Sequence, residues 1–223
     1  MTLTTQIKNN TFIMHPCGVL FWEEKATLLI SDVHLGKVSH FRKFGAAVPQ
    51  KAVAKNFKSL TESVDFFQPK VVCFMGDLFH SSLNKEWLLF EKWVSETDSK
   101  IVLVAGNHDI ISPLKYEDLG IEVVSEIQKD DFLFTHHPEE RTGFFNFSGH
   151  IHPAVRLRGG GRQTMRLSCF YKTTTQMILP AFGQFTGTYV LEPKENTEIF
   201  ATTGEEVFQV TLTESKKRKR FSG

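Results

Sequence analysis

The chain has 223 residues, a formal net charge of +1, 41% hydrophobic residues and 23% charged residues. These values fit one domain with a substantial core, and they do not make the chain as a whole a polyanion binder, so any attraction for nucleic acid must be local. Three cysteines at wide spacings suit neither a disulfide framework nor a zinc knuckle. The first residues lack the basic and apolar run of a targeting signal, and no segment approaches membrane-spanning length. We therefore expect a cytoplasmic protein.

The first half of the chain predicts strands that alternate with helices. Short apolar runs indicate the strands, and steps of four and three between apolar residues indicate the first helix. In order, the elements are strands 11–14, 19–22 and 26–30, a helix over 53–67, strand 70–75, a helix over 84–96 and strand 101–104. Strands separated by helices predict right-handed crossovers and a parallel sheet.

The second half of the chain predicts short strands with no convincing helix between them. They cover residues 121–124, 131–135, 144–148, 164–170, 176–179, 187–191 and 206–212. We expect these strands to form a second sheet packed against the first, as a layered α/β sandwich in a single domain over 1–213. Residues 214–223 form a basic tail that we expect to be disordered.

Polar side chains suited to metal binding follow the apolar strands. Asp77 comes directly after strand 70–75, at the end where open α/β sheets place ligands. Asp77 taken alone is equally well explained as an N-cap of the next helix. Residues of the same kind follow other strands, however, and this favours a metal-bridging carboxylate. The further candidates are Asp32, His34, Asn107, His108, His136 or His137, His150 and His152.

Spacing makes specific predictions about these ligands. In an extended chain Asp32 and His34 share one side, as do His150 and His152, so each pair could hold one ion. The adjacent residues His136 and His137 should point to opposite sides, so only one should bind metal. Carboxylate, imidazole and amide oxygen suit Mn²⁺, Fe²⁺ or Zn²⁺. Seven candidate ligands, counted without His108, favour two ions that share one carboxylate.

Five motifs in this order resemble the calcineurin-like metallophosphoesterase superfamily. They are Asp32-Val33-His34, Gly76-Asp77, Gly106-Asn107-His108-Asp109, His136 and Gly149-His150-Ile151-His152. Further segments resemble the ligase-associated DNA damage response endonuclease family, PdeM. They are Asp-Val-His-Leu-Gly-Lys at 32–37, His40-Phe41-Arg42-Lys43, Ala47-Val48-Pro49, Gly-Asp-Leu-Phe-His-Ser at 76–81 and Gly-His-Ile-His-Pro-Ala-Val at 149–155.

The resemblance implies a fold of two packed mixed sheets flanked by helices and a site for two divalent ions, with Mn²⁺ first and Fe²⁺ or Zn²⁺ as alternatives. It implies that Asp32, His34, Asp77 and His152 hold the first ion. It implies that Asp77, Asn107, His136 and His150 hold the second. His108 would meet the substrate as electrostatic stabiliser or general acid, oriented by Asp109. Two ions polarise phosphoryl oxygens and lower the pKa of a bridging water for in-line attack at phosphorus.

Other residues allow two interpretations each. His80 is either a substrate-facing group or a loop histidine. His40, Arg42 and Lys43 either border the substrate cleft or lie on the surface. Arg156, Arg158, Arg162 and Arg166 form either a solvated hairpin or a contact surface for a phosphate backbone. The basic tail is a solubilising end or adds nonspecific affinity for nucleic acid.

Three functions compete at this point. The first is a metal-dependent phosphodiesterase acting on DNA in repair, with a ligase, helicase or exonuclease as partners that the PdeM resemblance implies. The second is a small-molecule phosphoesterase, for example on a nucleotide or sugar-nucleotide pyrophosphate. The third is a non-catalytic scaffold on the same fold, which the intact ligand set and His108 argue against.

Overall fold

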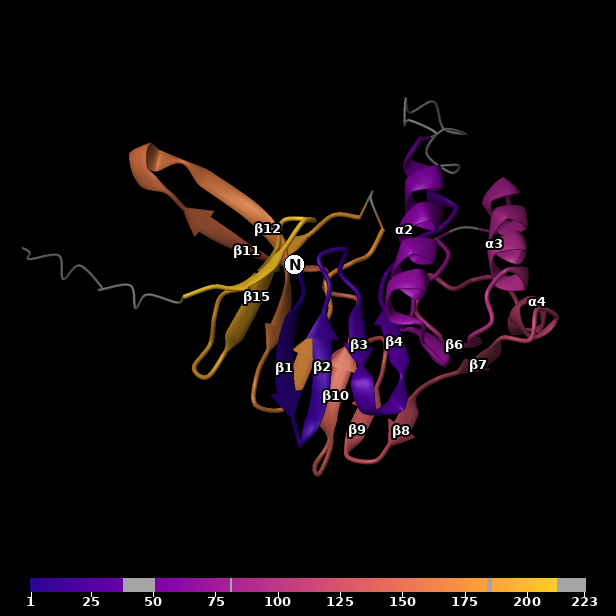
Figure 1. Cartoon of the computed structure of the whole chain (residues 1–223), viewed down its shortest axis with the longest axis horizontal. Helices are drawn as coiled ribbons and strands as arrows, with labels where there is room; N and C mark the ends of the chain where they lie inside the picture. Colours follow the sequence, from indigo (N-terminus) through magenta and orange to yellow (C-terminus); the bar gives the residue numbers. More distant parts are fainter. Residues whose placement is uncertain (38–50, 81, 184–185, 212–223) are drawn as a thin grey trace, which may run out of the picture.

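Two β-sheets pack against each other in the computed structural model, and helices cover the outer face of the first sheet (Figure 1). The structure describes residues 1–37, 51–80, 82–183 and 186–211. The predictions for the segment 38–50 (His40, Arg42, Lys43 and Ala47–Pro49) and for the tail 214–223 lie outside the described residues.

The first sheet contains seven strands in sequence order. They are β1 (Leu3–Ile7), β2 (Asn10–Met14), β3 (Leu20–Trp22), β4 (Thr27–Ile30), β5 (Val71–Phe74), β6 (Lys100–Val104) and β7 (Glu122–Val124). Pairing is antiparallel from β1 to β4 and parallel from β4 to β7. The parallel strands are joined through α2 (Lys51–Phe67), α3 (Lys85–Ser95) and α4 (Pro113–Glu117), with a 3-10 turn η1 (Glu23–Lys25) before β4.

The central strands of this sheet are apolar on both faces because both faces are covered. Along β4, Leu28 and Ile30 pack with the helices, whereas Leu29 packs between the two sheets. The alternation repeats in β5, where Phe74 faces the helices and Cys73 faces the second sheet. A strand buried on both sides needs a continuous apolar run, which is how the sequence predicted these strands.

The second sheet is formed by nine strands. They are β8 (Ile127–Lys129), β9 (Phe132–Phe134), β10 (Phe145–Ser148), β11 (Pro153–Arg158), β12 (Thr164–Lys172), β13 (Gln176–Ile178), β14 (Tyr189–Val190), β15 (Glu198–Thr202) and β16 (Val207–Gln209), with a 3-10 turn η2 (Gly160–Arg162). Their order is β14-β11-β12-β13-β10-β9-β8, and β15 pairs with β12 and with β16. Phe132, Phe134 and Phe147 face the first sheet and form much of the core between the sheets.

The predicted fold class, two packed mixed sheets with helices, is confirmed. One assignment was wrong: β7 belongs to the first sheet, parallel to β6, and not to the second. The strands β1, β8 and β15 and the short helix α4 were not predicted, and β11 was not among the predicted strands of the second sheet. No described helix is long and apolar enough to span a membrane, and the three cysteines are free thiols.

Candidate metal centre

The polar residues predicted to bind metal gather where strands of both sheets end. Asp32, Asp77 and Asn107 follow β4, β5 and β6, and His136 and His150 follow β9 and β10. Parallel strands bring their carboxyl ends to one edge of a sheet, and the packing of the two sheets joins the two edges. The cap interpretation of Asp77 is excluded, because the N-cap of α3 is Asn84, whose side chain accepts the Glu86 backbone N–H.

Three residues form what we call the first ligand group: Asp32, His34 and His152. Oδ1 of Asp32 lies 3.2 Å from Nε2 of His152 and 4.0 Å from Nε2 of His34. The two Nε2 atoms are 3.3 Å apart. Nδ1 of His152 donates to the carbonyl oxygen of Gly187 at 3.0 Å, so in the neutral imidazole Nε2 carries the free lone pair. Acceptor atoms therefore converge on one point, where a single cation could bind all of them.

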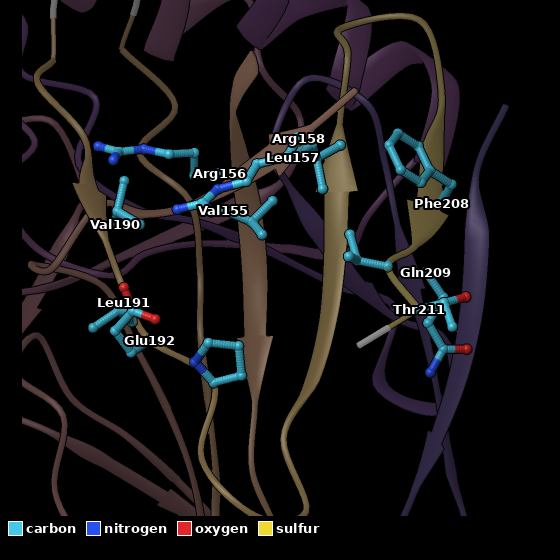
Figure 2. Close-up of a pocket in the computed structure, with 12 residues that line it drawn as sticks. Val155, Arg156, Leu157, Arg158, Val190, Leu191, Glu192, Phe208, Gln209 and Thr211 are labelled. Carbon is cyan, nitrogen blue, oxygen red and sulfur yellow. The ribbon is translucent and has the colours of Figure 1, made fainter. Parts of the chain in front are cut away.

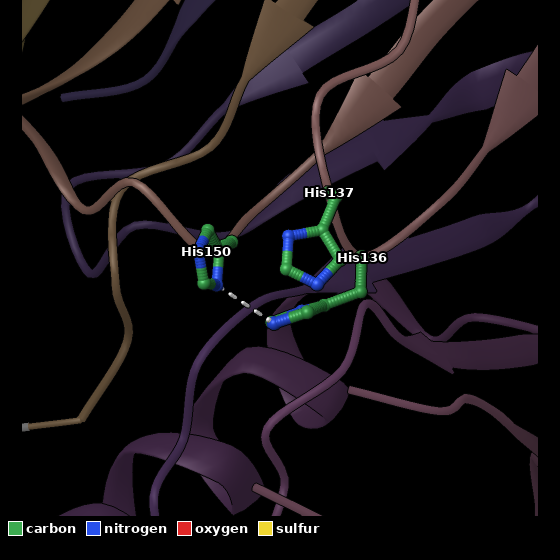
Figure 3. A group of neighbouring side chains, drawn as sticks. All are labelled: His136, His137 and His150. Carbon is green, nitrogen blue, oxygen red and sulfur yellow. Dashed lines mark hydrogen bonds between the residues drawn. The ribbon is translucent and has the colours of Figure 1, made fainter. Parts of the chain in front are cut away.

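The second ligand group consists of Asn107, His136 and His150. Nδ1 of His136 donates to the Met75 carbonyl oxygen at 3.0 Å, so its Nε2 presents a lone pair. That Nε2 lies 3.0 Å from Oδ1 of Asn107 and 3.2 Å from Nδ1 of His150. Figure 3 shows the two imidazoles facing each other.

His137 also lies beside the second ligand group, so the prediction that it points away from His136 was wrong. Its ring centroid is 4.8 Å from that of His136 and 4.1 Å from that of His150. Figure 3 shows the His137 ring beside the other two rings. The three residues can together offer nitrogen atoms within 4.8 Å of one another. The chain leaves β9 at Phe134 and is not a strand at these positions, so strict alternation does not apply.

Asp77 lies between the two ligand groups and faces both. Its Oδ2 is 4.0 Å from Nε2 of His34, and its Oδ1 is 3.4 Å from Nε2 of His136. Oδ1 also accepts the His108 backbone N–H at 2.9 Å, which fixes the orientation of the carboxylate. Asp77 is 1% exposed, so water does not compete for these positions. One carboxylate oxygen is thus directed to each group.

A glycine in each of three motifs makes room for a ligand from another motif. A Cβ on Gly76 would lie 2.2 Å from Nδ1 of His136, and one on Gly106 would lie 2.3 Å from Oδ1 of Asp77. A Cβ on Gly149 would overlap the Ser31 hydroxyl and the Asp32 carboxylate. Sequence reasoning used these glycines only as part of the motifs and missed that they let distant ligands approach.

The backbone at the ligands departs from the predicted extended geometry. Five ligands have left-handed backbone angles: Asp32 (φ 53°), His34 (φ 52°), Asp77 (φ 52°), His150 (φ 67°) and His152 (φ 52°). This conformation costs non-glycine residues about 1–2 kcal/mol each and concentrates at functional sites. Asp32 and His34 still share one group, but His150 and His152 do not: they turn to different groups, so the prediction that they form one pair was wrong.

The donor atoms fit divalent metal ions. Among the described residues, Oδ1 of Asp32 is buried with no hydrogen-bond partner. Its Oδ2 is held by the Ser31 hydroxyl and by the His150 backbone N–H. Burial lowers the pKa of His34 to about 3, which keeps this imidazole neutral and able to bind a cation. Carboxylates, neutral imidazoles and an amide oxygen suit Mn²⁺, Fe²⁺ or Zn²⁺.

Asp109 does not orient the His108 ring as expected. Its Oδ1 accepts the Phe79 backbone N–H at 3.0 Å and its Oδ2 accepts the Gly106 backbone N–H at 2.9 Å. Burial raises the pKa of this carboxyl to about 6. Asp109 therefore joins the loop after β5 to the loop after β6, and acts on the ligands by positioning both loops.

The structure brings His108 and His80 to the edge of the first ligand group. Their ring centroids are 4.3 Å apart, and they lie 5.8 Å and 5.2 Å from the His34 ring. Sequence reasoning missed Lys37. Burial lowers the pKa of this lysine, while the charges of Asp77 and Asp32 raise it. The available signal was its place directly after the first motif.

Arg156 and Arg158 are not brought to the ligand groups. Both are exposed and lie on β11, which begins directly after His152 and leads away from the centre.

Comparisons with known proteins show the family and the fold of the chain. The model of the calcineurin-like phosphoesterase family matches residues 26–195. The crystal structure of the Pseudomonas putida nuclease MPE superposes with a TM-score of 0.80 and 23% identity, covering 94% of this chain and 100% of that one; at this identity the likeness shows the fold. The E. coli phosphoesterase YfcE gives a TM-score of 0.38 and 14% identity over 78% of this chain and 86% of its own. No curated protein matches the chain.

Proposed function

Because the chain belongs to the calcineurin-like phosphoesterase family, we propose that it is a two-metal phosphodiesterase whose substrate is nucleic acid, with DNA first. The observation that carries the two-metal part is the position of Asp77. Its two carboxylate oxygens face different ligand groups, and its exposure of 1% removes solvent as a reason for that orientation. A carboxylate that served one ion would have no need of a second set of imidazoles on its other side.

The protein side chains supply position and proton transfer. Bound divalent ions would polarise the phosphoryl oxygens and lower the pKa of a water molecule. Asp32, His34 and His152 would hold one ion, and Asn107, His136 and His150 the other, with Asp77 shared. The His108 imidazole is in no ligand group and lies beside the first, where it can donate a proton to the leaving alkoxide or stabilise its charge. The backbone N–H of His108 donates a hydrogen bond to Asp77, which holds His108 beside the bridging carboxylate.

The choice of nucleic acid rests on a structural neighbour and on the motifs beyond the metal ligands. The neighbour with a TM-score of 0.80 is described as a nuclease, and the motifs beyond the metal ligands resemble the PdeM family. On this basis we propose DNA cleavage in repair, in a cytoplasmic protein, with a ligase, helicase or exonuclease as the expected class of partner. Mn²⁺ is the proposed ion.

Hydrolysis assays test the function directly. The purified protein with Mn²⁺ is offered single-stranded, nicked and duplex DNA and, separately, bis-p-nitrophenyl phosphate and a nucleotide pyrophosphate. We expect cleavage of DNA and of the small diester, both abolished by EDTA. Cleavage of the pyrophosphate alone would move the function to a small-molecule phosphoesterase. Retained metal with no hydrolysis of any substrate would favour the scaffold.

A further inference from the structure

The hairpin of β11 and β12 concentrates positive charge in a chain that is nearly neutral overall. Residues 153–172 contain four arginines, one lysine and no acidic residue, whereas the whole chain carries a formal net charge of +1. The lysine, Lys172, pairs with Glu198 at the base of the hairpin. The positive charge that remains lies toward the tip.

The strand register places three of the arginines on one face. Arg156 pairs directly with Arg166, and Arg158 pairs with Thr164 two residues further along β11. Residues directly opposite, and residues two apart, point to the same side of a ribbon. All three arginines are exposed, and within the described part of the chain no ion pair or hydrogen bond links them to an acidic group. Like charges directly opposite each other destabilise a strand pair.

The other face of the hairpin is apolar and joins it to the body of the protein. Val155 and Leu157 belong to a hydrophobic cluster that includes Leu191 and Phe208. A groove of about 1000 Å³ runs beside this cluster, and Arg156, Arg158 and Glu192 also line it. In Figure 2 the two labelled arginine side chains of β11 extend toward Val190, whereas Leu157 points toward Phe208. The apolar residues therefore join the hairpin to the body, while Arg156 and Arg158 line the groove and remain exposed.

The outer part of the hairpin is a two-stranded ribbon. β14 pairs with β11 only at Pro153 and Ala154, and β15 pairs with β12 only from Cys169 onward. Between these points no third strand of the described chain pairs with either β11 or β12. Figure 1 shows the ribbon projecting from the body, on the opposite side from α3 and α4.

The ribbon starts at the metal centre, because His152 directly precedes β11. A strand rises by about 3.3 Å per residue, so Arg156 and Arg158 lie about 13 Å and about 20 Å along the chain from His152. A small diester at the ligand groups does not span that distance, whereas a polymer with repeated phosphates does.

We propose that the cationic face of this hairpin, formed by Arg156, Arg158 and Arg166, binds the phosphate backbone of a nucleic-acid strand held at the metal centre. The inference rests on the proposed function and extends it, because it assigns where the strand leaves the site. Guanidinium groups form bidentate charge-assisted hydrogen bonds with phosphate and read no sequence, which suits a positioning contact. The phosphates of the bound strand would then neutralise the repulsion between Arg156 and Arg166, which lie directly opposite each other.

The salt dependence of DNA binding tests this assignment. Fluorescence anisotropy measures the affinity of a labelled single-stranded oligonucleotide across a salt series, in EDTA so that no cleavage occurs. The variant is R156Q/R158Q/R166Q. Each lost phosphate contact lowers the slope of log affinity against log salt by about 0.7, so we expect a decrease of roughly 2. The single variant R158Q, which leaves the arginine pair intact, should lose roughly 0.7.

A matched variant removes the same number of positive charges elsewhere. K58Q/K92Q/K129Q alters exposed lysines of α2, α3 and β8, and its slope should equal that of the wild type. Melting temperatures should show R156Q/R158Q/R166Q at least as stable as the wild type, because a repulsive pair is removed. An unchanged slope in the arginine variant, or an equal loss in the lysine variant, would overturn the assignment.

Failure of this inference is distinguishable from failure of the proposed function. If wild-type protein cleaves DNA while the arginine variant keeps the wild-type slope, the hairpin assignment is wrong and the function stands. If the wild type hydrolyses no diester, the function is wrong, and the slope measured in EDTA still decides the hairpin. Loss of small-diester hydrolysis in the arginine variant would place these side chains inside a compact pocket, and would also overturn the assignment.

Discussion

Replacing Gly76 by alanine should damage the metal centre from within the fold. Gly76 has φ +85°, and an added Cβ would lie 2.2 Å from Nδ1 and 2.5 Å from Cγ of His136. Nothing at that distance can stay in place, so the imidazole must move by about an ångström or more. Its hydrogen bond to the Met75 carbonyl is then lost, and Nε2 no longer points at the second ligand group.

The expected loss of stability can be divided into two parts. The left-handed conformation costs alanine about 1–2 kcal/mol, reduced by about 0.4–1 kcal/mol because alanine also restricts the unfolded chain. Overpacking adds about 1–3 kcal/mol, and the lost hydrogen bond adds about 1 kcal/mol. Gly143 provides the matched control, because it has φ +88° and no atom within 4 Å of an added Cβ. Gly143→Ala should therefore lose only the stability that the left-handed conformation costs, without overpacking or a lost hydrogen bond.

Thermal unfolding in EDTA separates the two variants, because no metal contributes there. The second part, about 2–4 kcal/mol, corresponds to a melting temperature roughly 4–16 °C lower for Gly76→Ala than for Gly143→Ala. Addition of Mn²⁺ should then stabilise Gly143→Ala as it does the wild type, and Gly76→Ala less. Equal melting temperatures of the two variants in EDTA would refute the reasoning, since both would then carry only the backbone cost.

Further substitutions test individual roles. Asp77→Asn should bind fewer than two ions per chain, because an amide cannot bridge two cations with a negative charge. If plasma emission analysis finds as much metal in the variant as in the wild type, the bridging role is excluded. His108→Ala should keep both ions and lose turnover of a small diester by about 10²–10⁴-fold; a metal-free or fully active variant contradicts its assignment. The affinity for Mn²⁺ should fall on acidification, and binding should release protons, because the pKa of His152 is raised and a proton there competes with the ion. Burial lowers this pKa, but the hydrogen bond and charge of Asp32 and the hydrogen bond to Gly187 together raise it above the ordinary value. A pH-independent titration calorimetry isotherm would show that His152 does not ligate.

The sequence predicted which strands carry the site because each ligand follows a continuous apolar run. Such runs are strands buried on both faces, as β4 and β5 are, and their carboxyl ends meet by topology. This reasoning needs no side-chain detail, so it located Asp32 and Asp77 at one edge. This reasoning missed β1 because its middle residues, 4–6, are polar, and it missed β15 because only three apolar residues, 199–201, follow one another there.

The periodicity of the sequence could not predict the local backbone geometry at the ligands. Alternation assumed an extended chain at His150 and His152, but both have left-handed angles, which turn them to different ligand groups. The tertiary fold holds these strained conformations, and no property of the residues themselves predicts them. Asp109 is a similar case: a carboxylate beside a histidine suggests an orienting pair, yet its oxygens accept backbone N–H groups from two loops. Only the packed structure shows which donors are near.

Anomalous diffraction from crystals of the wild-type protein soaked in Mn²⁺ tests the central claim most directly. The claim is that Asp77 joins two cation sites, one among Asp32, His34 and His152 and the other among Asn107, His136 and His150. We expect two anomalous peaks at full occupancy, each coordinated by a different oxygen of Asp77. A single peak, or two peaks of which either lacks Asp77 as a ligand, would contradict the account.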